Sequence, residues 1–340
     1  MKSYSLILIV VLLTIGCNQE RNVDSSFYYW QQRFNLSNLE KKYLNELKVN
    51  RLYIKFFDVV WDASANISKP AAIINFQDTL PENIEIIPTI YITNETISKS
   101  NEPEIIQLAE RTNKKIKDIL KKYNLNSIQE TQIDCDWSLS TRDKFFLFLE
   151  KLKAEDISLE LSATIRLHQI KFYKKTGIPP VDKGMLMFYN MGDLKNADTK
   201  NSILDLDIAQ QYLTNFDEYQ LPLDIALPIF RWGVLKRRER VVKLINNLNI
   251  SDLQDTTKYE AVSDINFKVK SSHYLNGYYL YPNDEIRIEQ VSFEELEKTK
   301  ELLKKQLQNQ ELTVTYYHLD DAVLEFYPEE DLKAITNGFK

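Results

Sequence analysis

Segments typical of β-strands alternate with amphipathic helical segments along most of this chain. The expected strands are short apolar or alternating runs, and apolar residues then recur at helical spacing. We place the strands at about 27–36, 51–58, 84–93, 128–137, 157–166, 184–191, 221–230 and 313–319. This alternation predicts a parallel sheet covered by helices, and eight strands favour an α/β fold, the (β/α)8 TIM barrel. The alternative is an open doubly wound sheet.

Composition narrows the classes of function. The chain has only seven glycines and no Gly-rich phosphate loop of either common type, which weighs against a nucleotide-binding open sheet. The net charge is −6 and no long basic run occurs, so nucleic acid is not expected as a partner. No segment points to a cofactor.

The N-terminus has the pattern of an export signal. Lys2 precedes the apolar run Leu6–Leu13, which is too short to span a bilayer. Thr14-Ile15-Gly16-Cys17 then resembles the lipobox of bacterial lipoproteins. The pattern predicts a signal peptide over residues 1–16, a lipid on Cys17 and a tether over residues 17–26. The expected location is the cell envelope, with the membrane contacted through the anchor. A plain secretory signal is the alternative.

One long stretch interrupts the strand–helix repeat. More than eighty residues separate the seventh and eighth strands. They include an expected hairpin over residues 274–281, with Asn276-Gly277 as a tight-turn signal, and a further short strand at 285–290. We therefore expect a barrel over residues 27–340 that carries an inserted α+β lobe at about 233–291. The hairpin tyrosines either form one wall of a groove or pack the hairpin on the barrel.

The fourth strand carries the most informative pattern. Polar residues at 132, 134 and 136 alternate with apolar residues at 133, 135 and 137. Asp134 and Asp136 therefore share one face of a strand that helices should cover. Buried carboxylates are costly unless they line a cavity or have a function. The alternative is a structural network with Arg166 or Lys55.

Polar and aromatic residues are dense at the expected strand ends, where TIM barrels place their active sites. These residues are Trp30, Lys55, Asp58, Tyr91, Asp134, Asp136, Arg166, His168, Tyr189, Asn190, Arg231, Trp232, His318 and Asp320. Aromatic faces stack on sugar rings and fixed polar groups bind hydroxyls, so the set suits a glycan or oligosaccharide.

Two of these segments resemble chitinase-like barrels of glycoside hydrolase family 18. Asp134-Cys135-Asp136-Trp137 resembles the Asp-x-Asp-Trp-Glu segment of that family's fourth strand. Residues 187–190, Met-Phe-Tyr-Asn, resemble its Met-x-Tyr-Asp segment on strand six, and Trp232 resembles a late aromatic that floors the sugar site. The resemblance implies a TIM barrel that acts on glycans. It places Asp134, Asp136 and Tyr189 in catalytic positions and the other strand-end residues around the substrate.

The sequence departs from the family at the catalytic acid, which is Ser138 here, and at the strand-six Asp, which is Asn190. A serine hydroxyl cannot act as a general acid near neutral pH. One explanation is that Asp136 is the acid, with its pKa raised by Asp134. A second is that another carboxylate has taken the role. The candidates are Asp58, Glu130 and Asp320. A third is a glycan-binding or scaffolding lipoprotein without catalysis.

A metal-dependent hydrolase is a further alternative. Its ligands would come from Asp134, Asp136, His168 and His318. No close histidine spacing supports such a site, so we expect no metal.

Overall fold

A computed structural model describes residues 21–81, 83–125, 128–194, 196 and 199–340. The predicted signal peptide and Cys17 lie outside these residues. Within the described ranges, none of the helices combines the length and the apolar character needed to cross a bilayer.

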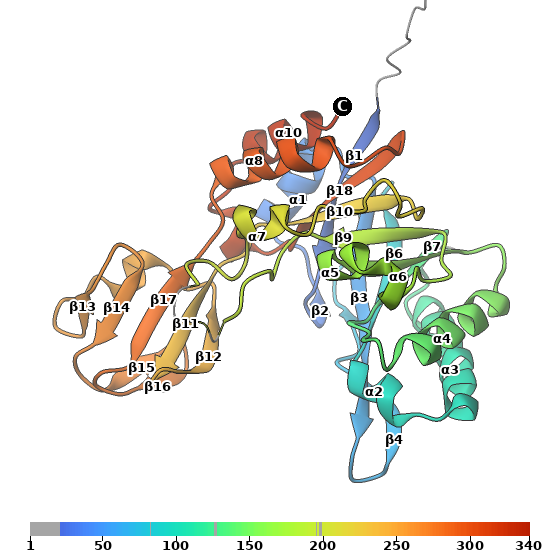
Figure 1. The fold of residues 1–340 in the computed structure, drawn as a ribbon, viewed down its shortest axis with the longest axis horizontal. Coiled ribbons are helices and arrows are strands. Elements are labelled where there is room, and N and C mark those ends of the chain that lie inside the picture. The colour runs from blue at the N-terminus through green and yellow to red at the C-terminus, as the bar shows by residue number, and fades with distance from the viewer. Residues whose placement is uncertain (1–20, 82, 126–127, 195, 197–198) are drawn as a thin grey trace, which may run out of the picture.

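Eight parallel strands form the closed barrel that the strand–helix alternation predicted (Figure 1). They are β1 (Asn22–Tyr29), β3 (Arg51–Asp62), β6 (Glu85–Ile92), β7 (Glu130–Asp134), β8 (Glu160–Arg166), β9 (Lys183–Met187), β10 (Leu223–Pro228) and β18 (Glu311–Tyr317). Strand β1 pairs in parallel with both β18 and β3, so the sheet has no open end. The open doubly wound sheet is therefore excluded.

Five longer and five shorter helices surround the barrel in the described part of the chain. The longer ones are α1 (Asn38–Glu46), α3 (Glu102–Lys122), α4 (Arg142–Glu155), α8 (Phe293–Lys304) and α10 (Glu329–Asn337). The short ones are α2 (Asn94–Lys99), α5 (Leu167–Lys171), α6 (Tyr173–Thr176), α7 (Leu206–Gln210) and α9 (Asp321–Leu324). Capping boxes begin α3 at Asn101 and α8 at Ser292, where the side chain accepts from the third helical N–H. Ile105, Leu108 and Ile116 lie on the buried stripe of α3.

The inserted lobe has its own sheet and its own apolar core beside the barrel (Figure 1). One antiparallel sheet contains β11 (Trp232–Arg237), β12 (Arg240–Asn246), β13 (Tyr259–Ala261), β14 (Asn266–Val269) and β17 (Glu285–Glu289). The expected hairpin is β15 (His273–Leu275) with β16 (Tyr278–Leu280), and its turn residues Asn276 and Gly277 both have positive φ. Helical structure in the described lobe is limited to the 3-10 turn η1 (Ile250–Leu253). Three short strands lie outside the lobe: β2 (Arg33–Phe34), β4 (Ile67–Ala71) and β5 (Asn75–Phe76).

The first barrel strand begins earlier than its sequence predicted. Strand β1 starts at Asn22, within the residues that we expected to form a polar tether. Asn22 and Asp24 pair in register with Glu311 and Thr313 of β18. Their polar side chains belong to the N-terminal rim of the barrel, where a strand can begin without an apolar pattern. The tether prediction for residues 22–26 is therefore wrong.

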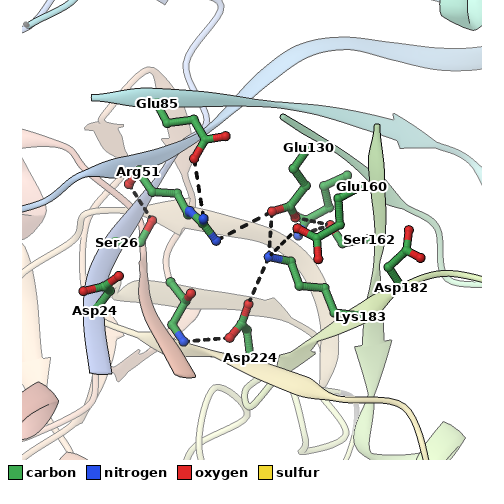
Figure 2. A network of polar contacts seen from close by, with 12 residues as sticks. Asp24, Ser26, Arg51, Glu85, Glu130, Glu160, Ser162, Asp182, Lys183 and Asp224 are labelled. Carbon is green, nitrogen blue, oxygen red and sulfur yellow. Dashed lines mark hydrogen bonds and ion pairs between the residues drawn. The ribbon is translucent and has the colours of Figure 1, made fainter. Parts of the chain in front are cut away.

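Charged side chains fill the N-terminal end of the barrel interior (Figure 2). We call Arg51, Glu130, Lys183 and Asp224 the basal network. Lys183 Nζ lies 2.7 Å from Glu130 Oε2 and 3.7 Å from Asp224 Oδ2, and Arg51 lies 3.8 Å from Glu130. Burial raises the pKa of the Glu130 and Asp224 carboxyl groups, and Lys183 opposes that rise. Glu130 therefore lies in a structural network at the end opposite the strand C-termini, which argues against it as the missing acid.

Candidate functional site

A cavity of about 450 Å³ opens at the C-terminal ends of the barrel strands. Its lining consists of Trp30, Tyr91, Asp134, Asp136, Arg166, Met187, Tyr189, Asn190, Phe230, Arg231, Trp232, Asn246, Asn247, Tyr317, His318 and Asp320. The structure thus brings together every predicted catalytic and substrate-binding residue except Lys55 and Asp58. We call this space the apical cavity.

A second cavity of about 490 Å³ adjoins the apical cavity on the same face. The two share the side chains of Asp136, Arg166, Tyr189 and Asn190. The second space adds Ser138, His168 and Tyr212, among others. Together they form an extended groove.

Asp134 is a buried carboxyl group that reaches the apical cavity. It ends β7, is 7% exposed, and accepts a hydrogen bond from the Thr164 hydroxyl of β8 (2.7 Å). Burial raises the pKa of Asp134 to about 6, while Arg166 and the Thr164 hydrogen bond partly oppose the rise. Such a group can be protonated near neutral pH and can give up that proton, as general acid catalysis requires.

Asp136 is held in a different way from Asp134. Arg166 Nε donates to Asp136 Oδ1 (2.6 Å) and Nη2 donates to Oδ2 (3.2 Å), and half of the Asp136 side chain is exposed. A bidentate arginine pair favours the charged carboxylate. The geometry therefore argues against Asp136 as the proton donor and favours Asp134. The structural network with Arg166, which was the alternative for both carboxylates, is thus present for Asp136, and the pair lies at the edge of the open groove.

Lys55 and Asp58 lie outside the lining of both cavities. Lys55 Nζ is 3.2 Å from Asp58 Oδ1, so the two residues pair with each other. Lys55 also lies 5.5 Å from the centre of the Trp30 ring. Their place in the site is thus indirect, because Lys55 supports an aromatic residue that does line the cavity.

Aromatic rings form much of the wall of the apical cavity. Tyr317 is at the centre of this group, with its ring 5.4 Å from Tyr189, 5.6 Å from Phe230 and 5.7 Å from Trp30. Trp232 continues the wall at 5.1 Å from Phe230. Ring faces in such a wall offer the stacking surface that sugars use.

The lobe fixes the position of Trp232 through Glu289, which is 1% exposed. Glu289 Oε2 accepts from Trp232 Nε1 (2.8 Å) and from the backbone N–H of Ser202 (3.0 Å). Glu289 Oε1 accepts from Arg287 Nε (2.8 Å) and Nη2 (2.5 Å). One carboxylate therefore ties β17, the start of β11 and the loop after β9 together at the cavity wall.

The polar side chains that follow β10 and β18 differ in how many of their hydrogen-bonding atoms have a partner. Asp320 caps α9 by accepting from the N–H of Ala322 (2.9 Å) and also accepts from Gln31 Nε2 (3.0 Å). His318 Nδ1 is buried and has no hydrogen-bond partner, and burial lowers the pKa of this histidine. Arg231 donates to the carbonyl of Ala322 (3.1 Å), while its Nε is buried without a partner.

Ser138, which follows Trp137 after the fourth barrel strand, belongs to a hydroxyl cluster. Ser138 Oγ lies 2.9 Å from Ser140 Oγ and 3.2 Å from Thr141 Oγ1, and the Ser138 N–H donates to Thr141 Oγ1 (2.9 Å). Thr141 in turn donates to Asn94 Oδ1 (2.6 Å). These bonds fix the turn that leads into α4, and they supply no acid near neutral pH.

The metal alternative gains no support from ligand geometry. In the described ranges, no group of three or more His, Cys, Asp or Glu side chains is arranged to hold an ion. Asp134 and Asp136 are engaged with Thr164 and Arg166. His168 lies in the second cavity and His318 in the apical cavity, so the four predicted ligands do not form one site.

Several lining residues were not anticipated from the sequence. Phe230 and Tyr317 precede predicted site residues by one position, so a wider reading of the strand ends would have found them. Asn246 and Asn247 come from the end of β12 in the lobe, for which no sequence signal existed. The hairpin tyrosines do not line either cavity; Tyr274 is 73% exposed. The lobe therefore contributes amide groups and Trp232 to the site, and of the two alternatives for the hairpin tyrosines, the one in which they form a wall of the groove is wrong.

Comparisons with solved structures show that the fold is similar to TIM barrels of known proteins. The spore cortex-lytic enzyme SleL of Bacillus cereus superposes with a TM-score of 0.57 at 12% identity, over 94% of this chain and 75% of that chain. A chitinase from Bacteroides thetaiotaomicron gives 0.57 at 12% identity, over 93% and 96%. A chitinase from Chromobacterium violaceum gives 0.53 at 11% identity, over 93% and 98%. No protein-family model and no curated protein matches the sequence. The shared feature is the TIM-barrel fold.

Proposed function

We propose that this protein is a divergent glycoside hydrolase that binds a glycan in the apical cavity and uses Asp134 as its general acid. The observation that carries the proposal is a buried carboxyl group with a pKa of about 6 at the edge of an aromatic-walled cavity. Structural neighbours that are described as chitinases or as a cortex-lytic enzyme support the substrate class.

The side chains around Asp134 have complementary roles in this proposal. Asp136 pairs with Arg166 and faces the groove, where a carboxylate stabilises positive charge that develops on a sugar ring. Tyr189 donates to Met187 Sδ (2.8 Å), which fixes its ring in the cavity wall. Trp232, held by Glu289, offers a stacking face.

A glycan panel followed by mass spectrometry of the products tests this function. We expect Asp134→Asn to reduce turnover by about 100-fold or more, because general acid catalysis contributes factors of that size. Glu160→Gln is a suitable control, because it removes a carboxylate from the opposite end of the neighbouring strand. Full turnover by the Asp134 variant would refute the assigned role.

A non-catalytic glycan-binding lipoprotein is the second candidate. The hydroxyl cluster around Ser138 favours it, since the family's acid position is filled by groups that cannot protonate a leaving group. Calorimetry would then show oligosaccharide binding, while prolonged incubation yields no product. If no glycan in the panel is bound or cut, both candidates fail.

We also propose that Cys17 carries a lipid that anchors the protein in the cell envelope, on the basis of the lipobox-like Thr14–Cys17. Because β1 begins at Asn22, residues 18–21 can span at most roughly 14 Å when extended. This reach would hold the N-terminal end of the barrel near the bilayer and turn the apical cavity away from it. Mass spectrometry of protein purified from its native membrane would detect the lipid, and Cys17→Ser should release the protein into the soluble fraction.

A further inference from the structure

We propose that the glycan bound in the apical cavity carries a carboxylate, and that Arg231 pairs with that carboxylate. The inference rests on the proposed glycan function and narrows its substrate class to acidic glycans, such as those containing uronic acids.

The first observation is that Arg231 is buried in the cavity lining and forms no ion pair within the described residues; Asp252, Glu325 and Asp320 act on it only from a greater distance. Its side chain follows β10 and is 7% exposed. The guanidinium carbon lies 3.3 Å from the centre of the Phe326 ring, and one nitrogen donates to the carbonyl of Ala322. Nε is buried and has no partner, and within the described residues Arg231 forms no ion pair. A buried cation without a counter-ion is costly unless a ligand completes it.

Other arginines of the chain show what a completed partner set looks like. Arg166 pairs with Asp136, Arg237 donates twice to Asp284 at 2.8 Å, and Arg287 pairs with Glu289. Each of these contacts is bidentate or charge-assisted. Arg231 stacks on Phe326 as Arg237 stacks on Tyr281, but it has no carboxylate like Asp284 beside it. The partner that would complete Arg231 is therefore a carboxylate.

Carboxylates of the cavity lining do not supply that partner. Asp134 is bonded to Thr164, Asp136 to Arg166, and both oxygens of Asp320 accept from Ala322 and Gln31. A neutral glycan would displace water from the cavity and leave Arg231 without a directly paired carboxylate.

His318 adds a second unsatisfied group in the same lining. Its buried Nδ1 has no hydrogen-bond partner, and burial lowers its pKa so that the neutral ring is favoured. A neutral histidine can still donate one N–H to an oxygen acceptor. An acidic sugar therefore offers acceptor oxygens to both groups, and its hydroxyls can meet the amides of Asn246 and Asn247.

The experiment compares acidic oligosaccharides with their neutral esters on the full mature chain. The probes are a galacturonate hexamer and a hyaluronan hexasaccharide, each as free acid and as methyl ester, with an N-acetylglucosamine hexamer as a neutral reference. Calorimetry at low and at moderate salt gives the affinities. The variants are Arg231→Met, Arg231→Lys and Arg240→Met, an exposed arginine of the lobe that matches the change in charge.

We expect at least one free acid to bind the wild type roughly 10- to 100-fold more tightly than its ester, as charge-assisted hydrogen bonds allow. Arg231→Met should abolish this preference, Arg231→Lys should retain part of it, and Arg240→Met should leave it unchanged. Thermal melting of each variant separates lost binding from lost folding, and the lysine variant keeps the test valid if the methionine variant is unstable.

Two results would overturn the inference. If esters or the neutral hexamer bind as tightly as the acids, the ligand is a glycan without the proposed carboxylate, and the proposed function survives. If an acid preference exists but persists in Arg231→Met and Arg231→Lys, another residue reads the charge. If no probe binds and no other glycan is found to bind, the proposed function itself fails.

Discussion

Two carboxyl groups on the same strand mark the two ends of the barrel interior and behave differently. Glu130 and Asp134 lie on the same face of β7, both are buried, and each accepts a hydrogen bond from a hydroxyl of β8. Glu130 also has Lys183 at 2.7 Å, whereas Asp134 forms no ion pair in the described chain and reaches an open cavity. Burial alone therefore does not single out a candidate acid; burial together with an open cavity and the lack of an ion pair makes Asp134 the stronger candidate.

The largest effect should come from breaking the basal network. Lys183→Met would leave Glu130 and Asp224 buried without their shared cation, and we expect it to lower the free energy of unfolding by about 3–5 kcal/mol. Urea unfolding at pH 7 measures this. Lys153→Met is the control, since Lys153 pairs with Asp182 at the surface and should cost about 1 kcal/mol or less. If the Lys183 variant is as stable as the wild type, then the ion pairs of Glu130 do not stabilise the fold, and the proposed difference between Glu130 and Asp134 is wrong.

A smaller effect of opposite sign is expected at the apical end. Burial raises the pKa of folded Asp134 to about 6, above the ordinary value of 3.8, so the folded state binds this proton more tightly than the unfolded state. Charged Asp134 therefore lowers stability above pH 6, and the cost disappears below about pH 4. Asp134→Asn removes this titration. Relative to the wild type, the variant should be about 2 kcal/mol more stable at pH 7.5 than at pH 4.5.

Urea unfolding at the two pH values measures that difference. The same difference measured for Glu110→Gln, on the exposed face of α3, provides a baseline for an exposed carboxyl group. If the relative stability of Asp134→Asn does not change with pH, then Asp134 is not the strained acid that the geometry indicates.

The smallest effect compares the two hydroxyl donors of β8. Thr164→Val removes the hydrogen bond that lowers the pKa of Asp134, so its midpoint should rise by about 1 unit or less. Ser162→Ala acts on Glu130 at the other end and should leave the Asp134 midpoint in place. Carbon-13 NMR of labelled aspartate carboxyls follows the titration. Equal shifts in both variants would mean that the two ends are coupled through the barrel.

Strand alternation predicted the barrel and most of its apical residues because both follow from local patterns. The period of two on β7 placed Asp134 inside, and parallel strands bring all their C-terminal ends to one face. The same period does not state how far along the barrel a residue lies. Glu130 therefore appeared as a candidate acid, although it lies at the opposite end.

The sequence could not predict which side chains pair with each other, because these pairs depend on the details of the folded structure. A register shift in β3 between Lys55 and Phe57 alters the order in which its residues face inward, and Lys55 and Asp58 pair with each other outside the cavity. Asn246 and Asn247 reach the site through the folding of a separate lobe, which depends on contacts distant in sequence.

The junction at Glu289 has a consequence for engineering and for evolution of this groove. Three chain segments donate hydrogen bonds to the Glu289 carboxylate. Replacing the lobe, the loop at Ser202 or Trp232 individually would therefore leave a buried charge without some of its partners. A transplant of the lobe into another barrel must therefore include the loop at Ser202 as well. We expect the lobe, this loop and Trp232 to change together among related proteins.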